Sequence, residues 1–384
     1  MKILWVNPSF LDYRIPVYKR LSDLTKGNFI LIYSKKRVPE RVITKIENAI
    51  GDHAVGLSNE RVLDVLPSRE FANTDLKLPY QPGLFKAISK VDADIIIGEG
   101  FFQWTPMALL RAKLKRKKFL IAYERTSHTE RNCPKWRTLY RKFISKFVNG
   151  YLVNGQLTKE YLIELGVSEE KIFIGGMSAD SECLVNRVNS SRFDELRILK
   201  SQLSLGNGLA YLYVGRINER KGVVNLLDAW KKHIQKFNGD SLLVVGTGPL
   251  YDQYVKEFFD CKSIKMLGCV DYDLIHRYYS IADVFVIPTL EDNWSLVVPE
   301  AMACGLPIAC SIYNGCYPEL VHEGINGKLF DPLKEETIIS ALEYFHNADL
   351  KLMGQESTKI EQKYSAYYVA QNIYKTCETF GFNG

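Results

Sequence analysis

The sequence lacks the features that mark membrane-spanning and disulfide-rich proteins. No stretch approaches the roughly 18 unbroken apolar residues that a membrane-spanning helix needs, and the apolar run at the start is short and ends at Asn7 and Pro8. The eight cysteines are scattered, form no C-x-x-C pair and show no zinc spacing with histidine. We therefore expect no transmembrane segment, no signal peptide and a reduced, cytoplasmic compartment.

Internal repeats and low-complexity segments are also absent, which argues against solenoid, fibrous and disordered classes. Hydrophobic residues make up 46% of the chain and charged residues 24%, the balance of a globular protein. The 384 residues are too many for one ordinary α/β domain and suit two domains of about 190 residues.

Positive charge is concentrated in the first half. Residues 1–190 carry 31 Lys and Arg against 20 Asp and Glu, whereas residues 191–384 carry 19 against 24. A basic half suits an anionic membrane surface, a phosphate-bearing acceptor or nucleic acid. We expect no nucleic-acid partner, because no recognisable binding module accompanies the charge.

Short apolar segments alternate with longer helical patterns along the whole chain. This alternation predicts parallel sheets with helices on both faces, the doubly wound α/β class, whose ligands lie beyond the carboxyl ends of the strands. A polar segment before Gly206 and Gly208 places the break between two such domains within 180–208. The expected strands are 2–6, 29–33, 94–97, 118–123, 150–153, 172–174, 210–214, 241–245, 264–267, 284–287 and 307–309.

The first chemical signal lies directly after the expected strand 210–214. Gly215 permits a tight turn at the strand end, and Arg216 and Lys221 stand five residues apart in the same loop. A guanidinium and an ammonium group directed at one point would bind a diphosphate. The alternative is a solvated basic turn.

The second signal is an acidic loop between the expected strand 284–287 and a helix that begins near Ser295 and ends at Gly305. The amino terminus of that helix would offer free N–H groups to a diphosphate. Asp292 precedes the helix and Glu300 lies within it, so their carboxylates could accept hydrogen bonds from sugar or ribose hydroxyls. The alternative is a helix-capping Asp with a solvated Glu.

These segments resemble the signature of the retaining glycosyltransferases of family 4, also called glycosyl transferases group 1. That signature is a carboxylate, seven residues and then E-A-M-A-x-G-x-P, and Asp292 followed by residues 300–307 matches it. Residues 215–222 match the family's G-R-x-x-x-x-K-G segment, and further matches fall at 245–249, 267–268 and 282–285. The resemblance is strong over residues 208–332 and loose before them.

The resemblance implies an α/β protein of the GT-B fold, with two Rossmann-like doubly wound domains that face each other across a cleft. The last helix of such enzymes often crosses back to the first domain. We therefore expect an acceptor-binding domain of residues 1–185 plus about 365–384, a linker over 186–207 and a nucleotide-sugar donor-binding domain of residues 208–364.

The resemblance also implies roles for the matched positions. Arg216 and Lys221 would bind the donor diphosphate and stabilise the leaving nucleotide, Glu300 would hold the ribose hydroxyls, and Asp292 would hold the transferred sugar. The family usually has Glu at the first carboxylate, so Glu291, next to Asp292, is the alternative for that position. The remaining expected donor contacts, many of them through the backbone, are at Gly215, Gly268, Val270, Asn293, Trp294, Ser295 and Leu296.

No cofactor and no metal ion are expected in this scheme, because the two cations and the helix terminus supply positive charge where the leaving phosphate needs it. Asp271 and Asp273 form a D-x-D sequence, which metal-dependent transferases of another fold use. Here Asp273 precedes an expected helix, and a helix cap explains it better.

The first half carries weaker signals. Residues 123–128 place Glu124, Arg125 and His128 beyond one expected strand. In many relatives a histidine of this region lies near the transferred sugar, so His128 is a candidate catalytic residue and Glu124 a candidate for substrate binding. The alternatives are a hydrogen-bonded surface histidine and a Glu124 that pairs with Arg125 or Arg14.

Residues 113–118 are a dense basic run followed by Phe119, and residues 135–147 are a helical pattern that is both basic and rich in aromatic residues. Trp136, Tyr140, Phe143 and Phe147 fall on one helical face. An interfacial membrane helix has this composition, and so does a helix packed on its own sheet, which is commoner. Peripheral contact of the first domain with an anionic membrane is therefore one of two interpretations.

The resemblance implies a retaining hexosyltransferase. It would move a hexose-type sugar from a nucleoside diphosphate donor, with UDP favoured, to a hydroxyl of a glycan or lipid-linked acceptor in polysaccharide or cell-surface glycan biosynthesis. It would act in the cytoplasm or at the inner face of the cell membrane. The alternatives are a non-catalytic scaffold subunit that binds a nucleotide sugar and, ranked lower, a GT-B nucleotide-sugar epimerase.

Overall fold

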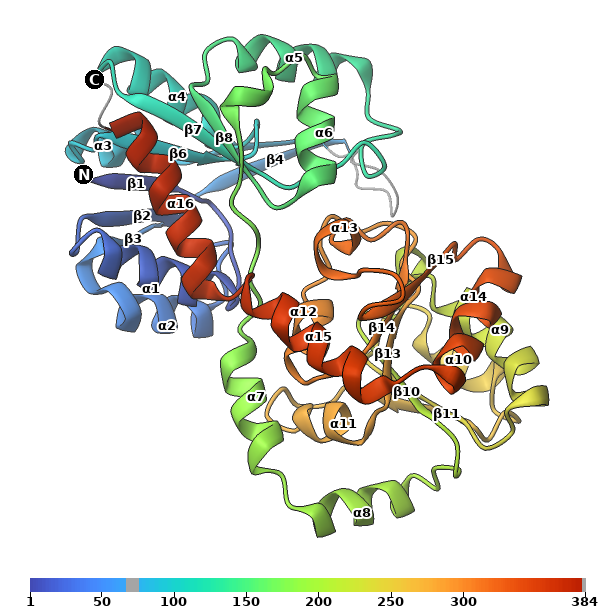
Figure 1. Cartoon of the computed structure of the whole chain (residues 1–384). Helices are drawn as coiled ribbons and strands as arrows, with labels where there is room; N and C mark the ends of the chain where they lie inside the picture. Colours follow the sequence, from blue (N-terminus) through green and yellow to red (C-terminus); the bar gives the residue numbers. More distant parts are fainter. Residues whose placement is uncertain (67–75, 382–384) are drawn as a thin grey trace. The chain divides into compact units, whose positions relative to one another are not determined.

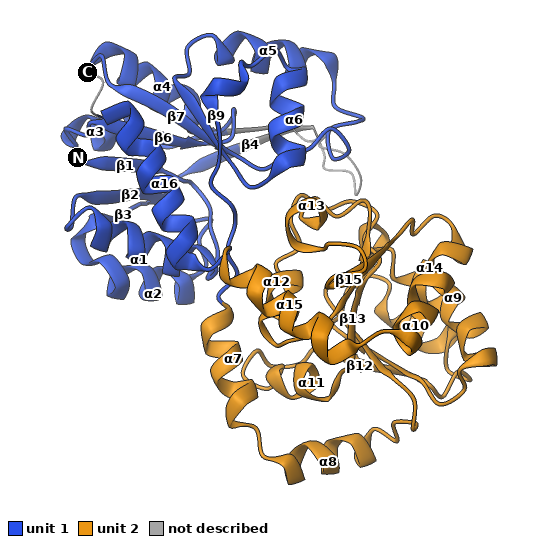
Figure 2. Ribbon diagram, viewed as in Figure 1, with its two compact units in different colours: residues 1–180, 364–384 blue, residues 181–363 orange. Residues whose placement is uncertain are grey.

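The computed structural model describes residues 1–66 and 76–381, which form two compact units (Figures 1 and 2). Unit 1 is drawn from residues 1–180 and 364–384, and unit 2 from residues 181–363. Each unit contains its own parallel sheet with helices on both faces. The predicted architecture of two doubly wound α/β domains is therefore confirmed.

The sheet of unit 1 has seven parallel strands in the order β3-β2-β1-β6-β7-β8-β9. Almost all of its central residues are buried, because helices cover both faces and leave no polar face to alternate with an apolar one. A separate antiparallel pair is formed by β4 (Arg61–Leu66) and β5 (Leu76–Tyr80). The strands of the main sheet are β1 (Ile3–Val6), β2 (Phe29–Ser34), β3 (Ala54–Leu57), β6 (Ile95–Glu99), β7 (Lys118–Tyr123), β8 (Gly150–Val153) and β9 (Ile172–Ile174).

Two hydrophobic cores lie on the two faces of this sheet (Figure 1). The first face is covered by α3 (Leu84–Lys90), α4 (Thr105–Leu114), α5 (Lys135–Ser145) and α6 (Gln156–Glu164). The second is covered by α1 (Arg14–Leu24), α2 (Glu40–Ile50) and α16 (Ala366–Gly381). The last helix thus completes the unit that the first strand begins.

The sheet of unit 2 has six parallel strands in the order β12-β11-β10-β13-β14-β15. Its central strands are continuous apolar runs, as expected for strands buried on both faces. The strands are β10 (Ala210–Val214), β11 (Ser241–Val245), β12 (Ile264–Gly268), β13 (Val284–Ile287), β14 (Ile308–Ser311) and β15 (Gly327–Phe330). The helices are α7 (Ser181–Ser190), α8 (Phe193–Gln202), α9 (Val223–Lys236), α10 (Tyr251–Glu257), α11 (His276–Ile281), α12 (Val297–Ala303), α13 (Tyr317–Leu320), α14 (Glu335–Tyr344) and α15 (Leu350–Gln362), with the short turns η3 (Glu219–Lys221) and η4 (Phe345–Asn347).

The segment expected to be a linker, 186–207, is instead largely helical and belongs to unit 2, which begins at residue 181. Arg187 of α7 forms an ion pair with Asp273 at 2.6 Å, and Ser181 donates to Glu361 at 2.7 Å. These contacts attach α7 to unit 2. They also show that Asp273 is an ion-pair partner and not the expected helix cap, since α11 begins three residues later, at His276.

No helix in the described part of the chain is both long and apolar enough to cross a membrane.

The close approach of the backbone after β10 and β11 requires glycine at Gly246 and at Gly248, where a Cβ would lie 2.1 Å from the Ile217 carbonyl oxygen. Gly246 has φ of +135°, and a Cβ atom there would lie 1.9 Å from the carbonyl oxygen of Gly215. Gly324 has φ of +77° but nothing within 4 Å of a Cβ. Substitution of these two glycines therefore compares a position that has both backbone strain and steric overlap with a position that has backbone strain alone.

We predict that Gly246→Ala lowers the free energy of unfolding by about 3 kcal/mol or more, because strain and overlap add. Gly324→Ala should cost only about 1 kcal/mol, from the backbone conformation alone. Urea unfolding of both variants gives the comparison, and equal losses would contradict the assignment of the Gly246 contact.

Candidate functional site

The two motif loops of unit 2 meet at the carboxyl edge of its sheet, because β10 and β13 are hydrogen-bonded neighbours. The first loop leaves β10 and the second leaves β13. One carbonyl group joins them: the Arg220 oxygen accepts from the N–H of Leu290 at 2.8 Å, from the N–H of Glu291 at 3.3 Å and from the hydroxyl of Thr289 at 3.1 Å. The motifs therefore form one site.

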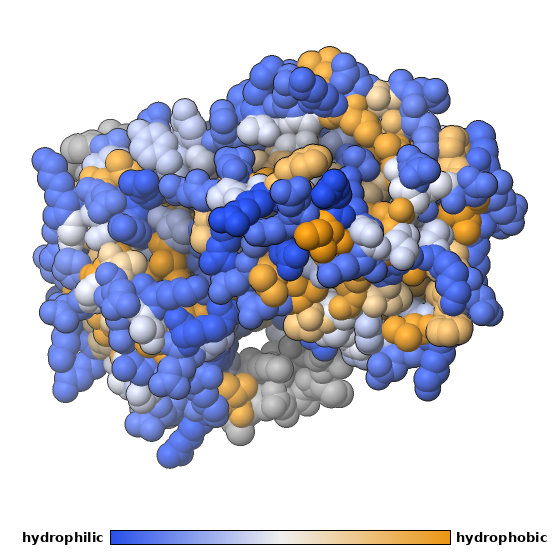
Figure 3. All heavy atoms as spheres, turned by 90° about the horizontal axis from the view of Figure 1, so that it is seen from below, coloured by the Kyte–Doolittle hydropathy of each residue, from blue (hydrophilic) through white to orange (hydrophobic). Residues whose placement is uncertain are grey.

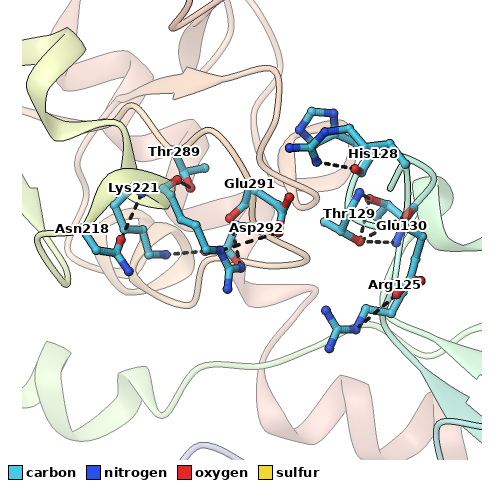
Figure 4. A network of polar contacts seen from close by, with 12 residues as sticks. Arg125, His128, Thr129, Glu130, Asn218, Lys221, Thr289, Glu291 and Asp292 are labelled. Atoms are coloured by element: carbon cyan, nitrogen blue, oxygen red, sulfur yellow. Dashed lines mark hydrogen bonds and ion pairs between the residues drawn. The ribbon is translucent and has the colours of Figure 1, made fainter. Parts of the chain in front are cut away.

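Lys221 and Asp292 face each other within this site (Figure 4). The Lys221 ammonium lies 2.5 Å from an Asp292 oxygen, which also accepts from the Ser295 hydroxyl at 2.7 Å. The other Asp292 oxygen accepts from the Trp294 N–H at 3.1 Å. Burial opposes ionisation of Asp292, but Lys221, Ser295 and the Trp294 N–H outweigh it and hold the pKa of this carboxyl below its usual value.

The adjacent carboxylate has a different surrounding. Glu291 is buried, and its oxygen lies 3.7 Å from the Arg220 guanidinium, which also donates to the Glu291 carbonyl at 3.3 Å. Asp292 therefore lies against Lys221, whereas Glu291 supports the loop through Arg220. This geometry favours Asp292 over Glu291 as the carboxylate that a ligand could reach.

Arg216 is exposed on the same loop and forms no ion pair within the described ranges. Its neighbour Gly215 donates to the Val245 carbonyl at 3.0 Å, and a Cβ at Gly215 would lie 2.8 Å from the Tyr213 hydroxyl. The loop that carries the paired ammonium of Lys221 thus also carries an exposed guanidinium with no ion pair in the described residues. Together they supply two positive charges at one sheet edge.

The helix that follows the acidic loop begins at Val297, two residues later than expected. The first N–H groups of any helix have no partner inside it, so those near Leu296 point toward the loop. Ser295 donates its own N–H to Asn314 at 3.3 Å, which fixes the start of the helix. Trp294 is buried and Asn293 half-buried, and the Trp294 N–H is engaged by Asp292.

Glu300 lies within α12 and accepts a hydrogen bond from the Tyr279 hydroxyl at 3.2 Å. Gly268 ends β12 with φ of +68°, and its carbonyl accepts from the Gly246 N–H at 2.8 Å. Val270 follows it and is half-buried. The structure therefore places every expected donor position of unit 2 either at the carboxyl edge of the sheet or on α12.

In unit 1 a buried arginine joins two carboxylates that follow neighbouring strands. Arg14 pairs with Glu124, just after β7, and lies 3.3 Å from Glu99 at the end of β6. Glu99 also accepts from the Trp5 indole N–H at 3.0 Å. Burial raises the pKa of Glu99 to about 7, although Arg14 opposes the shift. The structure thus confirms the alternative that Glu124 pairs with Arg14. Glu124 also lines a pocket.

That pocket has a volume of about 200 Å³ and opens at the carboxyl edge of the sheet. Charged and amide side chains dominate its lining, which suits a polar ligand rich in hydroxyl groups. The polar residues that line it include Asn7, Ser9, Glu99, Gln103, Glu124 and Arg125.

His128 is half-buried in the loop after β7 (Figure 4). Its carbonyl accepts from the Arg131 guanidinium at 2.6 Å. The loop is anchored to α5 by the buried Glu130, which accepts a hydrogen bond from Arg141 at 2.7 Å. The structure thus places His128 beside the pocket-lining segment in sequence, and its catalytic role stays a prediction.

A cluster that the sequence spacing did not reveal lies at the opposite, amino edge of the second sheet. The Nε2 atoms of His233 and His346 each lie 2.8 Å from the same oxygen of Asp240. The other Asp240 oxygen accepts the Leu209 N–H at 2.8 Å. These contacts connect α9, η4 and the start of β11.

Sequence reasoning missed three residues that shape the sites. Arg220 occupies an unspecified position of its motif, Asn314 follows a strand that we ended two residues too early, and Tyr279 lies in a helix without a recognised motif. Asn314 could have been found by examining the residues beyond each strand end. Nothing in the sequence distinguishes Arg220 or Tyr279.

The two units together match solved structures along nearly the whole chain. The HepE protein of Anabaena in complex with UDP has a TM-score of 0.75 at 17% identity, over 99% of this chain and 100% of that one. A glycosyltransferase of Rickettsia africae has a TM-score of 0.74 at 15% identity, over 100% and 99%. The fold is therefore GT-B.

Residues 209–347, about a third of the chain, match the family described as "Glycosyl transferases group 1". The α-monoglucosyldiacylglycerol synthase of Acholeplasma laidlawii is 27% identical over 48% of this chain and 46% of its own length. The sulfoquinovosyl transferase of Arabidopsis thaliana is 25% identical over 94% of this chain and 70% of its own. The chain thus spans less than half the length of the first of these relatives.

The buried pairing of Arg14 with Glu99 and Glu124 predicts a loss of stability on mutation that depends on pH. Arg14→Met should lower the free energy of unfolding by about 3 kcal/mol at about pH 8, because two carboxylates then lose their partner. The loss should be smaller near pH 5, since Glu99, with its raised pKa, is then protonated in the folded state.

The matched control is Arg41→Met. Arg41 pairs with Asp12 at 2.6 Å, but its side chain is 65% exposed, so its removal should cost less than about 1 kcal/mol at either pH. Denaturant unfolding at the two pH values tests both variants. A loss for Arg14→Met that grows toward low pH would contradict the assigned direction.

Proposed function

We propose that this protein is a retaining glycosyltransferase that moves a hexose-type sugar from a nucleoside diphosphate donor to an acceptor hydroxyl. The observation that carries the proposal is the grouping of Arg216, Lys221, Asp292 and the start of α12 at one sheet edge of unit 2. It combines two cations for a diphosphate with a carboxylate for sugar hydroxyls. The match to the group 1 family over the same residues supports it.

The chemistry follows from where charge develops. Cleavage of the bond between the anomeric carbon and the phosphate oxygen leaves a further negative charge on the nucleoside diphosphate. Arg216, Lys221 and the N–H groups before α12 would stabilise that charge more in the transition state than in the bound donor. Lys221 has three N–H donors, so it can keep its bond to Asp292 and still donate to a phosphate oxygen.

Retention is proposed to follow from attack on the face that the phosphate leaves. The acceptor oxygen then bonds to the anomeric carbon as the phosphate bond breaks, and the acceptor proton passes to the departing phosphate oxygen. Asp292 would hold sugar hydroxyls, and Glu300 the ribose. No resident metal or cofactor is part of this proposal.

UDP is the favoured nucleotide because UDP occupies structures of the same fold, those of HepE from Anabaena. The acceptor is proposed to bind the pocket of unit 1, where Glu124 and Arg125 offer an acceptor and a donor of hydrogen bonds. The names of two relatives, a diacylglycerol glycoside synthase and a sulfoquinovosyl transferase, support a lipid-linked acceptor in glycolipid or surface-glycan synthesis.

A non-catalytic subunit that binds a nucleotide sugar is the second candidate, since the first carboxylate is Asp where the family usually has Glu. The epimerase alternative stays ranked lower, because epimerases of this fold lack the E-A-M-A-x-G-x-P block that residues 300–307 carry.

Binding of the donor is tested by the thermal midpoint in UDP, GDP, ADP and dTDP, each with Mg²⁺ and with EDTA. We expect UDP to raise the midpoint equally in both conditions, because a ligand of the folded state stabilises it by mass action. Arg216→Ala should weaken UDP binding roughly tenfold or more. Arg192→Ala, which removes an equally exposed arginine of unit 2, should leave it unchanged.

No midpoint shift with any nucleotide would contradict the proposed donor site. A shift that disappears in EDTA would contradict its metal-free form.

The two neighbouring carboxylates allow a matched test of catalysis. Asp292→Asn should lower turnover of UDP-sugar, measured as released UDP, at least a hundredfold while UDP affinity stays within about threefold, because the loss falls on the sugar side. Glu291→Gln should instead lower the thermal midpoint and keep most of the turnover per folded molecule. An inactive wild type that binds UDP would favour the scaffold alternative, and the reverse pattern would assign the role to Glu291.

A further inference from the structure

Helix α5 of unit 1 takes the less common of the two orientations that its sequence allows, because much of its apolar side faces outward. Its arginines, Arg137 and Arg141, point inward and are buried like Ile144, whereas Trp136, Leu139 and Phe143 are exposed. A surface helix ordinarily buries its apolar face and leaves charge in water. This orientation therefore requires an explanation.

The inward arginines hold the helix in this rotation. Arg141 is 2% exposed, donates to Glu130 at 2.7 Å and to the Tyr161 hydroxyl at 2.9 Å. The guanidinium of Arg137 lies 4.8 Å from the centre of the Phe102 ring. Turning the helix to bury its apolar side would take Arg141 from the buried Glu130, whose pairing with Arg125 is longer, at 3.9 Å, and this loss is unfavourable.

The outward side carries two parallel stripes, which we name the α5 face. One stripe is apolar and the other basic, and they lie side by side because their positions are spaced three, four and seven residues apart. The apolar stripe is Trp136 (43% exposed), Leu139 (67%), Phe143 (56%) and Phe147 (42%), and the basic stripe is Lys135, Lys142 and Lys146, all exposed.

The helices α4 and α5 themselves carry only basic charge, and acidic side chains enter at their margins, where Asp92 pairs with Lys117 at 3.1 Å. The sequence has no acidic residue between Glu130 and Glu160, and none between Glu99 and Glu124. The second of these stretches contains α4, which covers the same side of the sheet and adds exposed Leu110 and Leu114, followed by the basic run 115–118. By contrast, the surface in Figure 3 is mostly hydrophilic with small, scattered apolar areas.

We propose that the α5 face docks onto an anionic lipid surface, with Trp136, Leu139, Phe143 and Phe147 entering the headgroup region and Lys135, Lys142 and Lys146 contacting acidic headgroups. Aromatic residues beside lysines are the composition that interfacial membrane helices use. An apolar stripe alone would suit a second copy of this chain, but the lysines beside it would repel the same lysines of a like copy. The proposal concerns attachment and does not depend on sugar transfer.

The experiment is flotation of the full chain with vesicles of phosphatidylcholine, alone and mixed with phosphatidylglycerol. We expect binding only to the anionic vesicles, weakened by salt because headgroup attraction is screened. Lys135→Gln, Lys142→Gln and Lys146→Gln together should weaken partitioning roughly a hundredfold. The matched control changes Lys19, Arg20 and Lys26 to Gln, since these exposed cations lie on the opposite face of unit 1.

The apolar stripe has its own test. Leu139→Ser with Phe143→Ser should weaken partitioning at least tenfold, whereas Phe193→Ser with Phe259→Ser, at comparably exposed positions of unit 2, should not. Trp136 is the exposed one of five tryptophans, so a blue shift on anionic vesicles that disappears in Trp136→Phe would report its insertion.

Equal binding to neutral vesicles, or binding that the stripe variants leave intact, would overturn the proposal. So would a dimer in sedimentation that the Leu139 and Phe143 substitutions dissolve, because it would assign the face to a second copy. The UDP-induced rise in thermal midpoint should persist in every variant. If the wild type itself showed no rise in thermal midpoint with UDP, that result would count against the donor site and not against the membrane surface.

Discussion

The contact between Lys221 and Asp292 is the constraint on which the site of unit 2 depends. It joins a loop that follows β10 to a loop that follows β13, and the Arg220 carbonyl reinforces the junction. An ion pair near a surface contributes little to stability by itself. Its value here is geometric, because it holds a carboxylate and an ammonium group together on the loops that follow two adjacent strands.

The parallel sheet makes such a junction possible. Because β10 and β13 are adjacent and point the same way, loops more than 70 residues apart in sequence begin at the same edge. The sheet of unit 1 does the same for Glu99 and Glu124, which follow the paired strands β6 and β7. In both units the parallel strands bring charged side chains together at the carboxyl edge of the sheet. Side-chain contacts then determine which of these groups is accessible.

Continuous apolar runs predicted most of the strands because buried parallel strands need nothing else to be recognised. β3 escaped prediction since its four residues are only half-buried and include Gly56, and β15 because its burial is broken by Lys328. Arg216, Lys221 and Asp292 were predictable because a family pattern spans them. The pairing of Arg14 with Glu99 was not, since it depends on strand order and on burial that no local pattern encodes.

The direction in which α5 faces was beyond prediction for a related reason. Its sequence fits a helix packed on a sheet as well as one that faces outward, and hydrophobic periodicity cannot separate the two. The outcome is decided by a buried acid, Glu130, which lies outside the helix and takes Arg141 inward. One buried carboxylate outside the helix thus determines which side of α5 is exposed to solvent.

Helix α16 also has a consequence for how the protein is made. Its residues Val369, Ala370, Ile373 and Cys377 are buried in a core that otherwise comes from the first part of the chain. During synthesis, unit 2 is continuous in sequence and can fold once residue 363 has emerged, while unit 1 still lacks one wall of its core. The unit that begins first is therefore completed last, and until then its apolar sheet face is the surface that chaperones would meet.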